Sequence, residues 1–121
     1  AGDYVKGMHL MLQMDEPDTF VLATNRTETV RDFVTMSFAA ADIGIDWSGE
    51  AEGETGRDRR TGDLLVKVNP QFYRPAEVDL LIGDPAYAES RLGWRAETTL
   101  EELCHAMVKA DLRRVQDGKS F

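Results

Sequence analysis

The sequence predicts an α/β protein in which a small sheet of short strands packs with helices. Apolar residues recur at helical spacing in several stretches, most regularly between Leu100 and Val115. Short apolar runs such as 19–24 and 64–68 are bounded by turn residues, which is typical of strands. A chain of 121 residues, 42% of them apolar, is long enough for one domain with a modest core.

The first part of the chain is expected to hold two helices with a buried strand between them. Residues 3–13 form a predicted helix whose apolar side chains occupy more than one face, so it should be buried on several sides. Residues 19–24 are apolar without alternation, as strands of a parallel sheet tend to be. Thr29 can then cap a second helix that has Asp32 at its third position and ends near Gly44.

Short strands are expected in the middle of the chain. Residues 45–47 begin an extended piece, and a glycine-rich excursion follows it up to a strand at 64–68. Residues 78–82 are apolar enough for one more short strand. The basic cluster 57–60 is interrupted by an aspartate and flanked by glycines, so we interpret it as a solvated loop without a function.

Two further helices are expected toward the C-terminus. Asp84-Pro85 can start the first one with a side-chain cap and a proline in the first turn. Gly93 can end it in the left-handed conformation, with Trp94 folding back on it. The second should begin behind a capping box of Thr99 and Glu102. Its apolar stripe consists of Leu100, Leu103, Cys104, Met107, Val108, Leu112 and Val115.

Composition argues against several classes of partner. Fourteen basic and twenty-two acidic residues give a net charge of −8, which repels nucleic acid and anionic membranes. The apolar runs are too short to cross a bilayer, and the first residues do not resemble a secretory signal. A single cysteine, Cys104, cannot form an internal disulfide, so the expected compartment is the cytoplasm.

Metal, nucleotide-cofactor and thiol chemistry are not expected from this chain. His9 and His105 have no second ligand at metal-binding spacing on the same helical face. Cys104 lies on an apolar stripe, which favours a core thiol over a nucleophile. No two glycines stand two residues apart, as a dinucleotide-binding loop requires.

The segment Arg74-Pro75-Ala76-Glu77 is the strongest candidate for ligand binding. Pro75 disfavours helical backbone at Arg74 and should present its guanidinium from an extended segment. That planar fork can donate two parallel hydrogen bonds to a diphosphate, and Glu77 could accept hydrogen bonds from ribose hydroxyls. By spacing alone, a surface ion pair between the two residues is the more frequent arrangement.

Several motifs resemble the carboxy-terminal region of GDP-mannose 4,6-dehydratases, members of the extended short-chain dehydrogenase/reductase family that act on nucleotide sugars. The resemblance implies that residues 1–121 are the substrate-binding domain and that an NADP-binding Rossmann domain lies upstream, outside this chain. The motifs are Gly2-Asp3-Tyr4-Val5, Asp15-Glu16-Pro17, Val30-Arg31-Asp32-Phe33, Phe72-Tyr73-Arg74-Pro75-Ala76-Glu77-Val78-Asp79, Gly83-Asp84-Pro85 and Leu92-Gly93-Trp94.

The resemblance also implies an activity for the complete enzyme. Enzymes of this family are lyases that convert GDP-mannose to GDP-4-keto-6-deoxy-mannose with tightly held NADP, for deoxysugar biosynthesis. Hydride leaves the sugar C4, water is eliminated across C5 and C6, and hydride returns at C6. A serine or threonine, a tyrosine, a lysine and a glutamate upstream would perform this chemistry. No tyrosine of this chain is followed four residues later by lysine, so the chain alone should be inactive.

Residue roles and assembly follow from the same resemblance. In the family, the matching arginine and glutamate contact the diphosphate and the nucleotide ribose, which implies these roles for Arg74 and Glu77. The complete enzyme is expected to be a homo-oligomer, a dimer or a tetramer. Two alternatives are the tail of another nucleotide-sugar epimerase or reductase, and a stand-alone binding or assembly module. The full Arg-Pro-Ala-Glu-Val-Asp string favours the dehydratase, and the apolar first helix favours a chain that has lost its neighbours.

Overall fold

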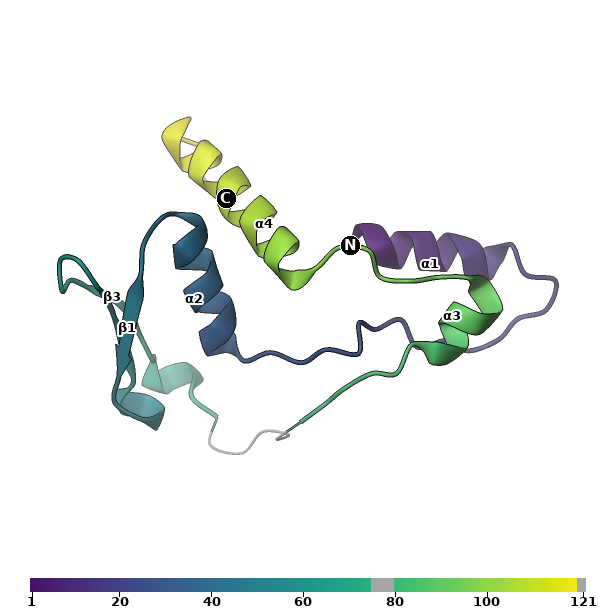
Figure 1. Ribbon diagram of the computed structural model, residues 1–121, viewed down its shortest axis with the longest axis horizontal. Helices are drawn as coiled ribbons and strands as arrows, with labels where there is room; N and C mark the ends of the chain where they lie inside the picture. The colour runs from purple at the N-terminus through teal and green to yellow at the C-terminus, as the bar shows by residue number, and fades with distance from the viewer. Residues whose placement is uncertain (75–79, 120–121) are drawn as a thin grey trace. The chain divides into compact units, whose positions relative to one another are not determined.

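The computed structural model describes residues 1–74 and 80–119, and it divides the chain into two compact units. Unit 1 comprises Ala1–Glu28 and Val78–Leu100, and unit 2 comprises Thr29–Glu77 and Glu101–Phe121. Figure 1 shows the order of the helices and strands along the chain. We describe each unit by itself.

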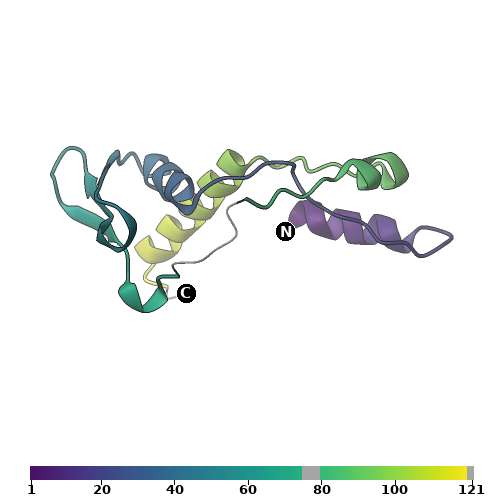
Figure 2. The ribbon, with the colours of Figure 1, turned by 90° about the horizontal axis from the view of Figure 1, so that it is seen from below.

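Unit 1 is built on two helices, α1 (Gly2–Leu12) and α3 (Ala86–Leu92), which contact each other (Figure 2). The indole of Trp94 is 2% exposed, and its Nε1 donates a hydrogen bond to the carbonyl oxygen of Asp3 at 2.7 Å. Gly7 is buried next to this indole. A Cβ added to Gly7 would lie only 3.1 Å from the indole nitrogen. The missing side chain of Gly7 therefore lets α1 approach Trp94 closely.

The ends of α3 follow the sequence prediction with one shift. Asp84 Oδ1 accepts a hydrogen bond from the amide of Ala86 at 2.9 Å, but Pro85 is the N-cap residue. The proline thus lies immediately before the helix and not in its first turn, because the helix begins one residue later than predicted. Gly93 ends α3 with φ of +66°, the left-handed conformation that was predicted.

Two predicted strands of unit 1 are not strands in the structure. Residues 19–24 and 80–82 belong to no helix, strand or sheet, while residues 78 and 79 lie outside the described residues. Within the described ranges, no backbone hydrogen bond joins either segment to another. A strand needs a neighbour for its N–H and C=O groups, and the described residues of unit 1 include no paired strand that these segments could join. The apolar composition of these segments was therefore recognised correctly, but their secondary structure was not.

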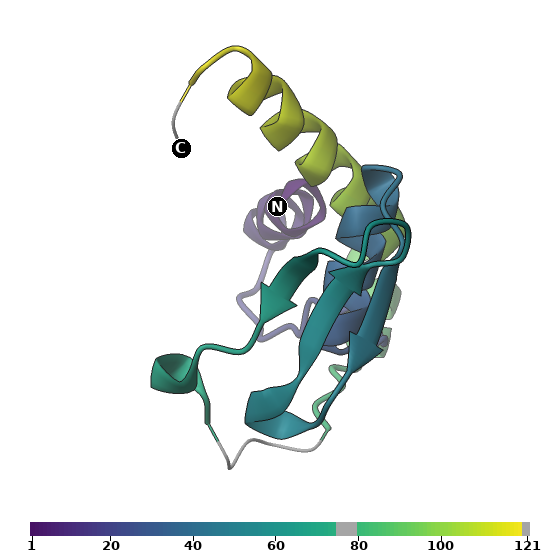
Figure 3. The ribbon, with the colours of Figure 1, turned by 90° about the vertical axis from the view of Figure 1, so that its left-hand side faces the viewer.

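Unit 2 contains a three-stranded antiparallel sheet in the order β1 (Ile45–Ser48), β2 (Thr55–Asp58) and β3 (Leu64–Lys67), shown in Figure 3. Ile45 pairs with Asp58 and Thr55 with Lys67, and a register shift occurs at Gly56/Arg57. The small sheet and the strand near 64–68 were predicted. Strand β2 was missed because its four residues lie within a glycine-rich stretch without apolar alternation.

The basic cluster 57–60 is consequently not a simple loop. Arg57 and Asp58 belong to β2, and the following residues form the turn to β3. Arg59 Nε lies 2.9 Å from Asp46 Oδ1, and Arg60 donates to the carbonyl of Asp42 at 3.2 Å. These contacts attach the β2–β3 hairpin to the residues around the start of β1. They give the basic cluster a structural role.

Helix α2 (Val30–Ala40) contacts β1, and the predicted cap is present, since Thr29 Oγ1 accepts from the amide of Asp32 at 3.0 Å. The side chain of Asp32 accepts from the amide of Thr29 in return, which completes a capping box. Trp47 of β1 donates from Nε1 to Thr35 Oγ1 at 2.9 Å. Two single-turn helices, η1 (Ala51–Gly53) and η2 (Pro70–Phe72), flank the strands. Helix α4 (Leu100–Gln116), predicted from its periodicity, belongs to unit 2 after its first residue.

Candidate functional site

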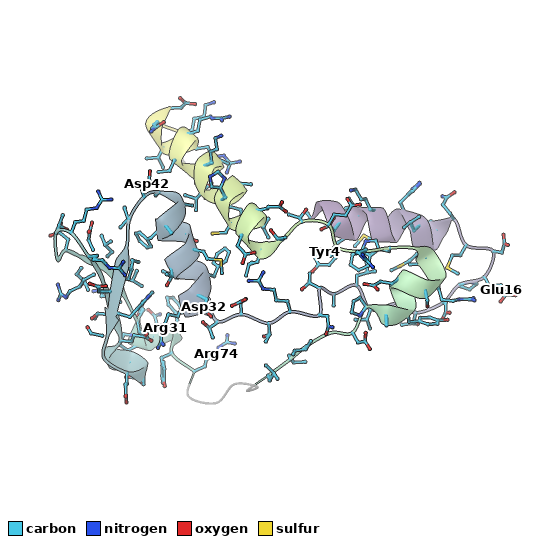
Figure 4. The ribbon with its side chains drawn as sticks, in the orientation of Figure 1. Tyr4, Glu16, Arg31, Asp32, Asp42 and Arg74 are labelled. Carbon is cyan, nitrogen blue, oxygen red and sulfur yellow. The ribbon has the colours of Figure 1, made fainter. Side chains whose placement is uncertain are left out.

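Arg74 follows the sheet of unit 2 at the end of a short connection that contains η2. Strand β3 is followed by η2, where the side chain of Asn69 accepts from the amide of Gln71 at 3.0 Å. The amide of Tyr73 then donates to the carbonyl of Pro70 at 3.3 Å. Arg74 belongs to no helix or strand and is exposed to solvent (Figure 4).

Glu77, the second predicted ligand, lies outside the described residues. The structure therefore describes the turn that precedes Arg74, whereas the carboxylate of Glu77 is not part of the described residues. A side-chain cap and a proline at the start of η2 favour the turn directly before Tyr73. Both residues remain candidates for the same ligand on the grounds given by the sequence.

An ion pair in unit 2 that is partly shielded from solvent was not predicted. Arg31, in the first turn of α2, lies with its Nε 2.5 Å from Oε1 of Glu54, which precedes β2 (Figure 4 labels Arg31). The side chain of Glu54 is only 17% exposed, whereas that of Arg31 is 55% exposed. The pair links the start of the helix to the sheet. Twenty-odd residues separate its members, so no local sequence pattern could have indicated it.

Two acidic residues of unit 1 bind polar groups far away in the sequence. The carboxylate of Asp3 accepts from the amides of Thr98 and Glu97 at 3.0 and 3.2 Å, and these bonds, that from Thr98 foremost, lower its pKa. Asp18 accepts a hydrogen bond from the hydroxyl of Tyr87 at 2.5 Å. That bond lowers the pKa of Asp18 and raises the pKa of Tyr87.

The contact with Asp18 opposes ionisation of the Tyr87 phenol. The carboxylate of Asp18 raises the pKa of Tyr87 and outweighs the nearby Arg91, which lowers it. The ring of Tyr87 also stacks on Phe20, with centroids 5.3 Å apart. Both contacts hold the segment after α1 against α3, which is a structural role.

Cys104 is a buried thiol, as its place on an apolar stripe predicted. Cys104 is 1% exposed, and its Sγ lies 3.2 Å from Ser37 Oγ, so it fills the space between α4 and α2. Among the described residues, no group of three histidine, cysteine or acidic side chains is arranged to hold a metal ion. A search of the same residues finds no helix with the length and hydropathy required to cross a membrane.

Comparisons with known proteins identify the family. The model of the family "GDP-mannose 4,6 dehydratase" matches residues 1–107. A GDP-mannose 4,6 dehydratase of Dictyostelium discoideum is 46% identical over 121 residues, which are the whole of this chain and 34% of the relative. One of Yersinia enterocolitica is 42% identical over 96% of this chain and 34% of the relative.

A third relative, from Homo sapiens, is also a GDP-mannose 4,6 dehydratase and is 46% identical over 93% of this chain and 30% of the relative. The chain therefore spans about a third of the length of the curated relatives it matches. Since the family model covers most of the chain, and includes the positions of Arg74 and Glu77, this chain belongs to the GDP-mannose 4,6-dehydratase family.

Proposed function

We propose that this chain forms the nucleotide-sugar-binding part of a GDP-mannose 4,6-dehydratase. In this proposal Arg74 binds the diphosphate of GDP-mannose and Glu77 binds the nucleotide ribose. The observation that carries the proposal is the family match over residues 1–107, because it spans the Arg-Pro-Ala-Glu segment. The complete enzyme converts GDP-mannose to GDP-4-keto-6-deoxy-mannose.

The charge of the chain supports a diphosphate role for Arg74. A net charge of −8 repels a sugar nucleotide, so binding requires a local cation that offsets this repulsion. Arg74 is exposed and follows the turn of η2, and a guanidinium matches the phosphate oxygens better than an ammonium group because it donates two parallel hydrogen bonds.

We further propose that NADP is held by parts of the enzyme that this chain does not span. NADP supplies hydride transfer to and from the sugar when bound. The residues of this chain do not fit the cofactor, because no glycine pair has the spacing of a phosphate-binding loop. The chain alone should then be an inactive part of a cytoplasmic homo-oligomer. Turnover of GDP-mannose by the pure 121-residue chain would contradict this.

A chimeric dehydratase allows the binding roles to be tested. In it, the matching 34% of the Dictyostelium relative is replaced by this chain. Arg74→Lys keeps the charge but loses the fork, so affinity for GDP-mannose should fall. Arg74→Ala should lower it further, by about ten- to a hundredfold, as expected for a charged hydrogen-bonded contact of ~1.5–3 kcal/mol.

The matched control is Arg57→Lys, an arginine of the β2 hairpin whose Nη1 donates to the carbonyl of Gly62 at 3.1 Å. This change should leave the affinity for GDP-mannose unaltered. Isothermal titration measures all variants. If both Arg74 variants bind GDP-mannose as tightly as the Arg57→Lys control does, Arg74 does not contact the ligand.

A further inference from the structure

Helix α1 has two apolar faces, and unit 1 covers only one of them. The covered face brings Gly7 against the indole of Trp94. At about 100° per residue, four other apolar side chains form a continuous stripe next to that face. All four are exposed, Leu12 to 82% and Met8 to 57%. They are Tyr4, Val5, Met8 and Leu12; Figure 4 labels the first of them.

The remaining third of α1 is polar, with Lys6, His9 and Gln13 on it. Lys6 forms an ion pair with Glu97 at 2.9 Å, so this third has the composition of a solvated face. The exposed stripe is apolar and does not have the composition of a solvated face. A helix with a polar third and two apolar thirds is expected to pack against two neighbours, and α3 with Trp94 accounts for one of them.

Two further segments of unit 1, residues 19–24 and 80–82, also carry apolar side chains that are not covered. They run close together, because a Cβ built on Gly83 would lie 2.6 Å from the Cβ of Ala23. Val21 and Leu81 are nevertheless exposed, the latter to 76%. Within the part of the chain that the structure describes, neither 19–24 nor 80–82 has a backbone partner in a sheet. Apolar segments that are exposed and have no sheet partner are places where a strand of another part of the protein can pair.

We propose that the exposed stripe of α1 and the apolar segments at Val21 and Leu81 form one docking surface, and that its occupant is the part of a dehydratase-length polypeptide that this chain does not span. The chain matches 34% of the Dictyostelium relative, which leaves about two thirds of that polypeptide unmatched. A partner for this surface must place apolar side chains against the stripe of α1. It must also place the edge of a strand beside the segments at Val21 and Leu81. The proposal rests on family membership and does not depend on Arg74 or Glu77.

The test compares Leu12→Asp and Met8→Asp with the matched control Gln13→Asp. Leu12 and Gln13 are neighbours at the end of α1, so both changes add the same charge at the same helix end. Each variant is made in the 121-residue chain and in the chimeric dehydratase. The readouts are the urea midpoint of unfolding and the rate of native-state proteolysis, neither of which depends on binding of GDP-mannose.

In the chimera, Leu12→Asp and Met8→Asp should raise the rate of proteolysis at least about tenfold over Gln13→Asp, because a carboxylate would be buried against the partner. In the 121-residue chain, the three variants should unfold at the same urea concentration, because all three positions are exposed. Equal behaviour of Leu12→Asp and Gln13→Asp in the chimera would overturn the proposal, and so would an unsubstituted chimera that does not fold.

Sedimentation of the 121-residue chain tests the competing occupant. A dimer that Leu12→Asp dissociates and Gln13→Asp does not would show that a second copy of this chain covers the stripe, which also overturns the proposal. A chain that remains monomeric, or whose association is insensitive to Leu12→Asp, agrees with it. Loss of GDP-mannose binding with intact folding of the chimera would refute the proposed function and leave this inference standing.

Discussion

Replacing Trp94 with phenylalanine should destabilise unit 1 far more than the same change at Trp47 destabilises unit 2. Trp94 is 2% exposed and donates to the backbone carbonyl of Asp3 at 2.7 Å. Phenylalanine removes that donor and leaves a gap beside Gly7. The lost hydrogen bond contributes about 1 kcal/mol and the unfilled space roughly 1–3 kcal/mol, so we expect a loss of ~2–4 kcal/mol in the free energy of unfolding.

Trp47→Phe is the matched control because the chemistry is identical and the surroundings differ. Trp47 donates to the hydroxyl of Thr35, which is exposed and can bond to water instead. The expected loss is therefore only ~0.5–1.5 kcal/mol. Urea unfolding followed by circular dichroism measures both losses, with urea midpoints that differ by roughly 1 M for ordinary slopes. A Trp94→Phe loss equal to or smaller than the Trp47→Phe loss would refute the packing argument.

Two further changes test the Asp18–Tyr87 contact and the end of α3. The pKa of Asp18 is lowered in the folded state, so the stabilisation that its ionised form contributes is present above its usual pKa of 3.8 and is lost as the pH falls. The pKa of Tyr87 is raised in the folded state, so the stabilisation that its neutral form contributes is present below its usual pKa of 10.0 and is lost as the pH rises. The melting temperature of wild type should therefore exceed that of Tyr87→Phe most between these values, and a difference that does not vary with pH would contradict the contact. Gly93→Ala should cost about 0.5–1.5 kcal/mol in urea unfolding, because φ is +66° although no atom lies within 4 Å of the added Cβ. Gly2→Ala, equally open, should cost nothing, and equal effects of both would argue against strain at Gly93.

Local sequence signals predicted most of the helices well. Thr29 marked the start of α2 as its cap, and Gly93 marked the end of α3. These signals succeed because each depends on residues within one turn of the helix. The all-round apolarity of 3–13 predicted a helix buried on several sides, and this was wrong for the described residues: Gly7 is the buried residue of α1, and an apolar stripe of the helix is exposed.

Features that depend on distant partners could not be predicted in the same way. Residues 19–24 have the composition of a buried strand, but composition does not supply the neighbour that a strand requires. The Arg31–Glu54 and Asp18–Tyr87 contacts join residues far apart in the sequence. The same distinction between local and distant partners applies to the candidate site. The turn before Arg74 follows from Asn69-Pro70, whereas the role of Glu77 stays a prediction because it depends on a ligand.

The central claim is that the Arg-Pro-Ala-Glu segment binds the nucleotide part of GDP-mannose, and the most direct test changes the ligand and the protein together. In the chimeric dehydratase, removing the ribose 2′-hydroxyl of GDP-mannose should weaken binding by about 0.5–3 kcal/mol if Glu77 accepts its hydrogen bond. Glu77→Ala should erase most of that difference, since the cycle isolates the pairwise term. If Glu77→Ala instead weakens the ribo and deoxyribo ligands by the same factor, with the fold intact, Glu77 does not bind the ribose and the account is contradicted.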